Sequence, residues 1–216
     1  MDCKMDGNKK DLIVLVHGFA AKRLVMWPFA CLLRARGFRV RFWSYGTLFD
    51  PIEKHAIRFY DYLHSVTATE RRFHIVAHSM GCIATQSALN FGGFPNLGRI
   101  VLLAPPNAGS PIARIASKVI GRLIIPTSEL SDTETSYVNQ LERKSTADVG
   151  IIAARFDALV PISSTHLPNE KAHVVINATH NSLLLSMKAS KLTARFLTHG
   201  SFEEIAIAPV SHRMLD

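Results

Sequence analysis

The sequence predicts an α/β protein with a doubly wound, mainly parallel sheet of about six strands. Apolar runs rich in Val and Ile alternate along the chain with stretches of helical character, which is the order expected of strand–helix–strand units. Runs that are apolar throughout, rather than alternating, are expected to be strands that are buried on both faces. A chain of 216 residues is long enough for one domain with an ample core, and nothing indicates a second.

Six segments are predicted to be strands because they are short apolar runs bounded by turn residues. In chain order they cover residues 11–19, 38–46, 72–79, 99–105, 149–157 and 172–180. In a parallel sheet the carboxyl ends of the strands share one edge, and ligands bind beyond it. The residues that follow each strand therefore matter most for function.

Four segments between and after these strands are predicted to be helices. In chain order they cover residues 27–37, 50–66, 80–91 and 181–197. Gly37 is the expected stop of the first helix. Asp50 is the expected cap of the second, with Pro51 at its first helical position. Asn181 or Ser182 is available to cap the fourth.

Ser79 lies between the third strand and the helix that follows it, with Ala77 two positions before and Gly81 two positions after. A tight turn that lifts a serine hydroxyl above the sheet needs small residues at both positions, because larger side chains would clash with neighbouring backbone. Such a turn also aims the backbone N–H of Met80 at the same space. The alternative is that Ser79 is only a helix N-cap, a frequent role for serine.

A serine nucleophile needs a base, and the base needs an acid that orients it. Asp157 stands at the end of the fifth strand in ARFDALVP, and His180 at the end of the sixth in INATHNSLL. Each has an ordinary alternative. Asp157 would then only cap a turn, and His180 would be one loop histidine among the ten histidines of the chain. Three such residues at three strand ends, in the order Ser79, Asp157 and His180, favour a catalytic triad.

Other acids and histidines fit these roles less well. Asp148 precedes its strand, at the wrong edge of the sheet. His166 falls in a loop, His173 at a strand start, and His74 inside the third strand. His78, beside the serine, would be turned away from it by the tight turn, so a packing or hydrogen-bonding role is expected.

The first strand ends in LVHGF, where Gly18 permits a close approach of backbone. The N–H of Phe19, with Ala20 as an alternative, is therefore expected to be a second oxyanion donor beside that of Met80. The alternative is that His17 and Gly18 form a plain turn.

The segments VHGF, VAHSMG, LLAPPNAGS, ARFDALVP and ATHNSLL together resemble the α/β-hydrolase superfamily, and within it the small serine esterases and lipases. The resemblance covers roughly residues 11–197. Ala77 departs from the pattern, because it stands where the family's first elbow glycine is usual. The resemblance implies a single domain over residues 1–216 with a minimal α/β-hydrolase fold and no full cap domain.

The resemblance implies Ser79 as nucleophile, His180 as general base and acid, and Asp157 as orienting acid, with the N–H groups of Phe19 and Met80 as the oxyanion hole. It implies a carboxylic ester hydrolase that acts on a small-molecule or lipid ester and needs no cofactor or metal. An acyltransferase or thioesterase with the same triad remains an alternative, as does a non-catalytic scaffold used for binding. The oligomeric state stays open.

Residues 106–148 fall where relatives insert a cap or lid, and are too short for a full cap domain. Within them, residues 110–126 are partly amphipathic and basic, so they either touch a lipid surface or form a helix packed against the sheet with a loop behind it. The second alternative is favoured. Residues 198–216 are a tail in which FEEIAIA is a short strand or a helical turn.

Composition excludes several other classes of protein. A hydrophobic content of 48% with 19% charged residues is typical of a compact globular chain. The three cysteines are widely spaced and support neither a disulfide framework nor a zinc site. The net charge of +8 comes from scattered residues without a nucleic-acid motif, so no nucleic-acid partner is expected. Without a signal peptide or an apolar run of membrane-spanning length, we expect a cytoplasmic protein, although a chain whose leader had been removed would read the same.

Overall fold

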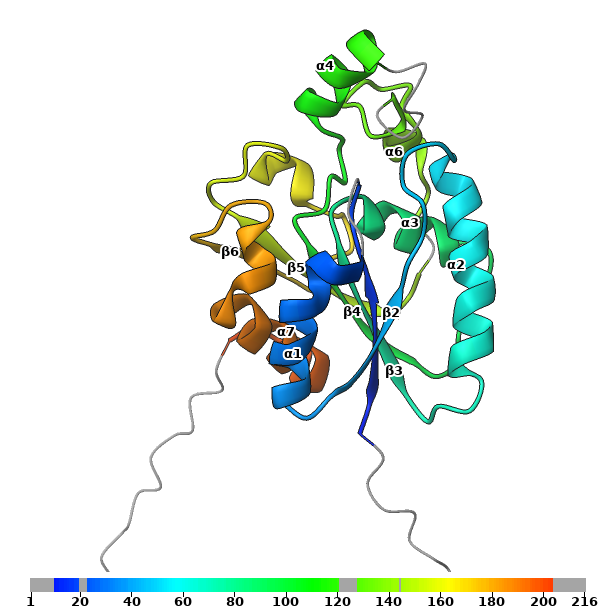
Figure 1. Ribbon diagram of the computed structural model, residues 1–216, viewed down its shortest axis with the longest axis vertical. Helices are drawn as coiled ribbons and strands as arrows, with labels where there is room; N and C mark the ends of the chain where they lie inside the picture. The colour runs from blue at the N-terminus through cyan, green and yellow to red at the C-terminus, as the bar shows by residue number, and fades with distance from the viewer. Residues whose placement is uncertain (1–9, 20–22, 121–127, 144, 204–216) are drawn as a thin grey trace, which may run out of the picture.

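A computed structural model of the chain describes residues 10–19, 23–120, 128–143 and 145–203. Within them, a six-stranded sheet has the order β2-β1-β3-β4-β5-β6, and every strand is parallel to its neighbours (Figure 1). The strands are β1 (Leu12–Val16), β2 (Arg39–Trp43), β3 (Phe73–His78), β4 (Leu97–Leu103), β5 (Asp148–Ala154) and β6 (Ala172–Ile176). The predicted fold class is confirmed, and the described residues contain no full cap domain.

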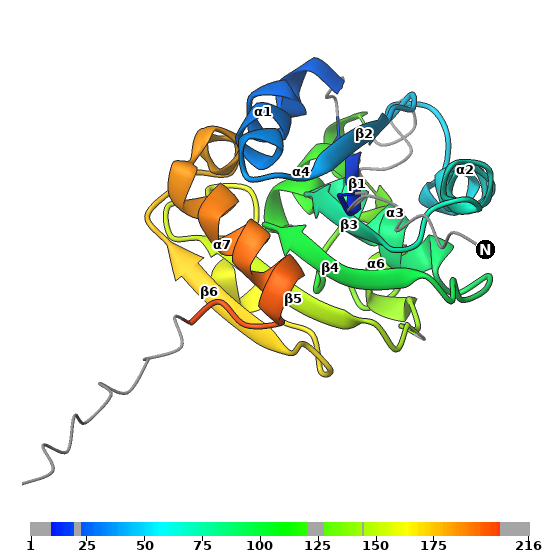
Figure 2. The ribbon, with the colours of Figure 1, turned by 90° about the horizontal axis from the view of Figure 1, so that it is seen from below.

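Helices cover both faces of the sheet, α1 and α7 on one and α2 and α3 on the other (Figure 2). The helices are α1 (Trp27–Ala35), α2 (Ile52–Thr67), α3 (Met80–Ala88), α4 (Pro111–Ile120), α6 (Tyr137–Gln140) and α7 (Met187–His199). Short 3-10 turns are η1 (Arg23–Met26), η2 (Ile162–Thr165) and η3 (Ser182–Leu185). Every residue of β1 and β3 is buried, which explains why β1 is apolar throughout and why β3 is apolar apart from His74 and His78.

Two separate core clusters hold these layers together. Phe29 and Leu33 of α1 and Phe196 of α7 are fully buried against one face of the sheet. Phe59 and Leu63 of α2 are fully buried against the other. Each such side chain contributes about 1.5–3 kcal/mol relative to an exposed position. The sheet edge that carries the strand ends is therefore fixed from both sides.

The predicted start of α2 is wrong. The helix begins at Ile52, and Pro51 precedes it in an extended conformation with φ −60° and ψ 153°. The Asp50 carboxylate ion-pairs with Lys54 instead of capping the helix. The N–H of Ile52 is bound by the Glu129 carboxylate at 2.9 Å, so a residue far along the chain satisfies this helix end.

The predicted start of the last helix is also wrong. η3 comes first, and α7 begins at Met187, where the Ser186 hydroxyl accepts the N–H of Ala189. The hydroxyl of Ser182, one of the two expected caps, instead accepts the N–H of Thr179 at 2.8 Å. This turn lets the chain leave the sheet edge before it enters the helix.

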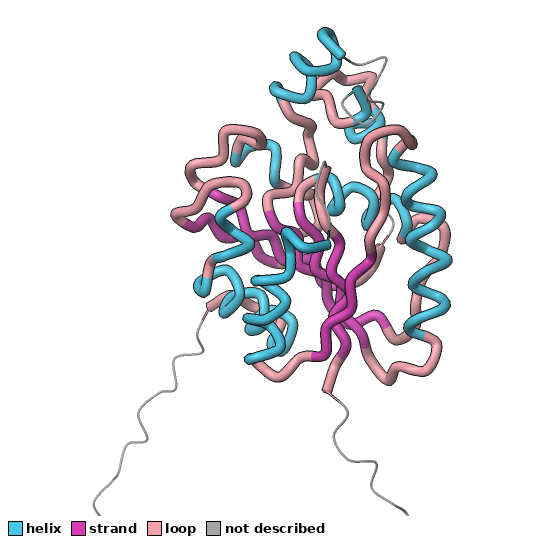
Figure 3. The backbone as a smooth tube through the Cα atoms, viewed as in Figure 1, coloured by secondary structure: helices cyan, strands magenta, loops and turns pink. Residues whose placement is uncertain are grey.

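α4 stands beyond the carboxyl ends of the strands, and loops gather around it there (Figures 1 and 3). The expectation that it packs against the sheet is wrong, because Ala113 packs on a third cluster that includes Met80 and Ile83 of α3. Residues 121–126 of the predicted lipid-contact segment lie outside the described part of the chain, as does most of FEEIAIA. None of the described helices is long and apolar enough to span a membrane.

Candidate active site

Ser79 occupies the N-cap position of α3 in a conformation that is rare for a residue with a side chain. Its φ is 53° and its ψ is −128°, and its side chain makes no capping hydrogen bond. A conformation of this kind costs about 1–3 kcal/mol and persists only where the surroundings impose it. The backbone N–H of Ser79 donates to the Leu103 carbonyl at 3.0 Å, which ties the turn to β4. The N-cap alternative therefore does not explain the serine.

Two glycines allow the close packing around this turn. A β-carbon added to Gly81 would lie 2.5 Å from the His17 carbonyl oxygen. A β-carbon added to Gly18 would lie 2.8 Å from the β-carbon of Ser79 and 3.2 Å from the His78 carbonyl oxygen. β1 and β3 are neighbours in register, with Val16 opposite Ala77, so the loop after β1 lies directly against the serine.

Phe19 and Met80, whose N–H groups are the expected oxyanion donors, both lie close to Ser79. Met80 opens α3, so its N–H has no acceptor within the helix and stands at the positive end of the helix dipole. Phe19 follows Gly18 and lines the same pocket as Ser79. The structure thus brings Phe19 and Met80 to the serine, whereas Ala20 lies outside the described residues.

His17 holds the loop that carries Phe19. Its Nδ1 donates to the Gly18 carbonyl at 3.0 Å, and its Nε2 accepts the N–H of Tyr45 at 3.4 Å. Burial lowers the pKa of His17, which favours this neutral tautomer. Tyr45 adds a hydrogen bond from its hydroxyl to the His17 carbonyl at 2.9 Å and stacks on the ring with centroids 4.6 Å apart. Sequence reasoning missed Tyr45, whose only signal was an aromatic residue just after β2.

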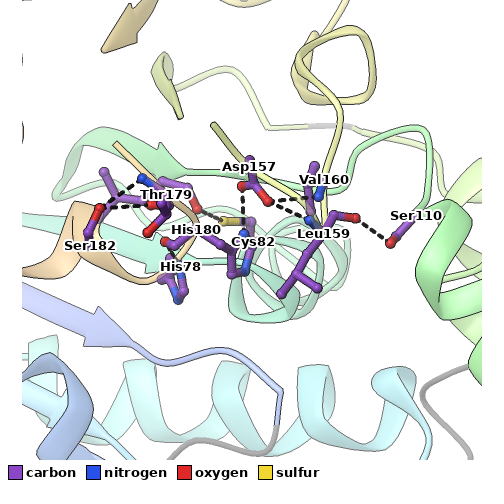
Figure 4. Close-up of polar contacts among 10 residues, drawn as sticks. His78, Cys82, Ser110, Asp157, Leu159, Val160, Thr179, His180 and Ser182 are labelled. Carbon is purple, nitrogen blue, oxygen red and sulfur yellow. Dashed lines mark hydrogen bonds and ion pairs between the residues drawn. The ribbon is translucent and has the colours of Figure 1, made fainter. Parts of the chain in front are cut away.

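Asp157 and His180 meet across neighbouring strand ends. β5 and β6 are paired, and the N–H of Phe156 donates to the Ala178 carbonyl at 3.0 Å, which extends the pairing past both strands. His180 Nδ1 then lies 2.7 Å from Asp157 Oδ2 (Figure 4). Their side chains are 9% and 2% exposed, so the pair is shielded from water.

The carboxylate of Asp157 is kept in its charged form by several donors. Oδ1 accepts the N–H groups of Leu159 and Val160 at 2.8 and 2.9 Å (Figure 4). Burial alone would raise the pKa of Asp157, but the hydrogen bond and charge of His180 together with these two N–H groups bring it below its ordinary value. A carboxylate only accepts hydrogen bonds, so Nδ1 of His180 carries a proton and its Nε2 is the basic nitrogen.

His78, next to Ser79, binds backbone. Its Nε2 lies 3.1 Å from the carbonyl oxygen of His180, and because a carbonyl only accepts, Nε2 carries the proton (Figure 4). Burial, with the nearby His180, lowers the pKa of His78 to about 3. The ring is therefore neutral and supports the segment that holds His180.

An apolar pocket of about 250 Å³ opens beside Ser79. Its walls come mainly from α4 and from the loop after β5, with Ile112, Ala113, Ala116, Leu130, Leu159 and Val160 among the lining residues. The hydroxyl of Ser110, also in the lining, donates to the Leu159 carbonyl and accepts the N–H of Ala113. The pocket therefore suits an apolar group.

A larger groove of about 840 Å³ lies at the opposite edge of the sheet, where β4 and β5 begin. Asn90, Gly93, Ser145 and Asp148 are among its lining residues, which include no histidine or cysteine. Because no histidine lies there to activate a serine, we place the candidate site at Ser79. Across the described part of the chain, no group of three or more His, Cys, Asp or Glu side chains is arranged to hold a metal ion.

Comparison with known proteins points to one family. The family model described as the alpha/beta hydrolase family matches residues 13–181. Among solved structures, a Bacillus licheniformis lipase in mature form is similar with TM-score 0.71 and 16% identity, over 89% of this chain and 92% of that one. Aspergillus fumigatus lipase B has TM-score 0.71 and 18% identity, over 90% of this chain and 54% of that one.

A metagenomic carboxyl esterase is similar with TM-score 0.66 and 15% identity, over 88% of this chain and 76% of that one. No curated protein matches the sequence. At these identities the structural likeness concerns the fold, and the chain spans only about half the length of the Aspergillus lipase.

Proposed function

The chain belongs to the α/β-hydrolase family, and on that premise we propose that it is a serine hydrolase that cleaves carboxylic esters through an acyl-enzyme on Ser79. The observation that carries the proposal is the backbone of Ser79, with φ 53° and no capping bond from its side chain. Strain of this kind, in a residue without a structural duty, is typical of a functional site. The names of the similar lipases and esterase agree with this reaction class.

In the proposed reaction, Nε2 of His180 takes the proton of the Ser79 hydroxyl as the serine oxygen attacks the ester carbonyl. The resulting tetrahedral oxyanion is stabilised by the N–H groups of Phe19 and Met80. Removal of one such donor typically costs about 10²–10³ in kcat, so the pair supplies a large share of catalysis. Asp157 keeps Nδ1 of His180 protonated and stabilises the imidazolium that forms.

The alcohol then leaves with the proton from His180, and the acyl group stays on Ser79. Water attacks this acyl-enzyme by the same route, with His180 again as base, and releases the carboxylic acid. Every proton transfer passes through one nitrogen, so the reaction needs no group beyond these side chains and backbone donors.

The apolar pocket supports an ester with an extended apolar acyl part. A cavity of about 150 Å³ holds a benzene ring, so the pocket of about 250 Å³ scales to about ten carbon atoms. Because the polar atoms of Ser110 are already bonded, a charged or strongly polar acyl group would lose hydration there without gaining partners.

Ester hydrolysis by the purified chain and by Ser79→Ala tests the proposal. We expect hydrolysis of p-nitrophenyl esters, with the highest kcat/KM at about eight to ten acyl carbons because of the pocket volume. Ser79→Ala should lose the activity and keep its circular dichroism spectrum and melting temperature. Undiminished turnover by Ser79→Ala would exclude Ser79 as the nucleophile.

The same experiment separates the alternatives. An acyltransferase or thioesterase would transfer the acyl group to an added alcohol or thiol in competition with water, or would prefer thioesters. A binding scaffold would show no turnover and no labelling of Ser79 by a fluorophosphonate probe.

A further inference from the structure

Five large apolar side chains are exposed near the start of α1 and around η3. They are Leu24 (69% exposed), Val25 (44%), Trp27 (55%), Leu185 (64%) and Met187 (69%). The two segments lie close together, because α1 contacts η3 and the guanidinium of Arg36, just past the end of α1, donates to the Met187 carbonyl at 3.4 Å. Exposed apolar residues that gather on one surface mark a site that binds a partner or a membrane.

The same surface is strongly basic. Residues 12–49 and 171–202 contain no Asp or Glu. The basic residues of η1, α1 and α7 and at their ends include Arg23, Arg34, Arg36, Lys188, Lys191 and Arg195. Arg34 and Arg36 donate to backbone carbonyls, and among the described residues neither pairs with a carboxylate. On the opposite face, α2 and the residue just before its cap carry Asp50, Glu53 and Asp61 together with Lys54 and Arg58, which both pair with Asp50, so that face carries both signs of charge.

We propose that this surface, formed by η1, α1, η3 and α7 and called here the α1–α7 face, docks on an anionic lipid membrane. Exposed aliphatic and tryptophan side chains insert at the boundary between headgroups and acyl chains, and basic side chains on the same surface are attracted to anionic headgroups. Tryptophan is enriched at that boundary. Leu24, Leu185 and Met187 favour a lipid over a nucleic acid, which offers no aliphatic layer to receive them.

The α1–α7 face adjoins the proposed active site. η3 begins two residues after His180, and η1 follows the loop that carries Phe19. α1 and α7 share one side of the sheet (Figure 2), and a membrane that reaches η1 and η3 on that side lies near the ends of β1 and β6, which precede them. The proposed membrane binding is supported by the residues of the α1–α7 face alone. The further statement that this binding brings lipid esters to Ser79 rests on the proposed function.

Co-sedimentation with vesicles tests the docking with the full-length Ser79→Ala variant, so that catalysis does not alter the membrane. We expect binding to vesicles of phosphatidylcholine with phosphatidylglycerol, and weak binding to phosphatidylcholine alone. Salt should weaken the binding, because the Debye length falls from about 10 Å at 0.1 M to about 3 Å at 1 M.

Variants of the α1–α7 face should lose binding. Lys188→Glu should weaken the partition coefficient at least fivefold, the effect expected from about one basic residue near an anionic surface. Leu185→Asp should weaken it by tenfold or more, because it places a charge where an apolar side chain inserts. Matched controls lie on α2, where Ile57→Asp replaces a 47% exposed apolar residue and Lys54→Glu reverses a surface charge.

Equal binding to both kinds of vesicle, binding to neither, or equal losses in the α2 controls would overturn the proposal. Binding to a DNA or RNA duplex in place of vesicles, or self-association that Leu185→Asp abolishes without any membrane binding, would also overturn it. Hydrolysis of water-soluble p-nitrophenyl esters by the wild-type chain is measured in parallel. Ester hydrolysis without vesicle binding would contradict only the membrane docking. Vesicle binding without ester hydrolysis would contradict only the proposed reaction.

Discussion

His180 Nδ1 lies 2.7 Å from Asp157 Oδ2, while the second carboxylate oxygen of Asp157 accepts the N–H groups of Leu159 and Val160. The carboxylate is thus fixed by its own loop, and the oxygen that remains faces the imidazole. This arrangement fixes both the orientation of His180 and the position of its proton.

Replacement of that carboxylate by an amide should remove activity without unfolding the chain. In Asp157→Asn, the amide oxygen can still accept from Leu159 and Val160, but the NH₂ group would face Nδ1 of His180 and favour the wrong tautomer. We expect kcat for a p-nitrophenyl ester to fall by about 10⁴, with a small change in melting temperature. Asp148→Asn, at the opposite edge of the sheet, is the control and should keep its activity. A loss below tenfold in Asp157→Asn would contradict the role of the pair.

The packing of Gly81 predicts a sensitive position. In Gly81→Ala, the new β-carbon would meet the His17 carbonyl oxygen at 2.5 Å and a Val16 methyl at 2.9 Å. Overpacking of this kind costs about 1–3 kcal/mol and would push α3 from β1, so both the melting temperature and kcat should fall. Gly93→Ala is the control, because nothing lies within 4 Å of its added β-carbon. The same melting temperature for both variants would count against this close approach.

The contact between Tyr45 and His17 predicts a long-range effect on catalysis. Tyr45→Phe keeps the ring stack and removes the hydrogen bond to the His17 carbonyl. The loop with the Phe19 N–H should then be less well positioned. A hydrogen bond worth about 1 kcal/mol corresponds to roughly fivefold in kcat, and KM should stay unchanged.

Tyr62→Phe is the matched control for this variant, because its hydroxyl donates to the Phe42 carbonyl at 3.2 Å, in a bond that involves no residue of the site. Steady-state kinetics of both variants with one p-nitrophenyl ester make the comparison. An equal loss of kcat in the two variants would mean that Tyr45 acts only through general stability.

Burial of the neutral His78 predicts acid sensitivity. Its pKa is about 3 in the folded chain and near 6.5 when unfolded, so the unfolded chain binds an extra proton between these values. The free energy of unfolding should therefore fall as pH drops from 6.5, by up to about 3 kcal/mol at pH 4 from this group alone. In His78→Gln, the amide can still donate to the His180 carbonyl. The slope of the free energy of unfolding against pH should fall in this variant by the amount that corresponds to about one proton. Urea titrations at several pH values measure it, and an unchanged slope would show that His78 is not the group responsible.

The sequence was sufficient for the sheet, because most strands are distinct apolar runs, β2 alternates Arg39 and Arg41 with apolar residues, and the chain order of Ser79, Asp157 and His180 follows the strand ends. It was insufficient where distant residues decide local structure. The N–H of Ile52 is bound by Glu129, so the start of α2 could not be read from its own neighbours. Tyr45 meets His17 only after β2 and β1 pair, and α4 takes its place from packing on α3.

Labelling with a fluorophosphonate probe, followed by mass spectrometry of the digested protein, tests the central claim most directly. A serine activated by His180 should take up one probe molecule per chain, at Ser79, with release of fluoride. His180→Ala should slow this labelling strongly, while Cys82 and the other serines stay unmodified. Labelling at a different residue, or no labelling of a folded chain that hydrolyses esters, would contradict the assignment of Ser79 as the nucleophile.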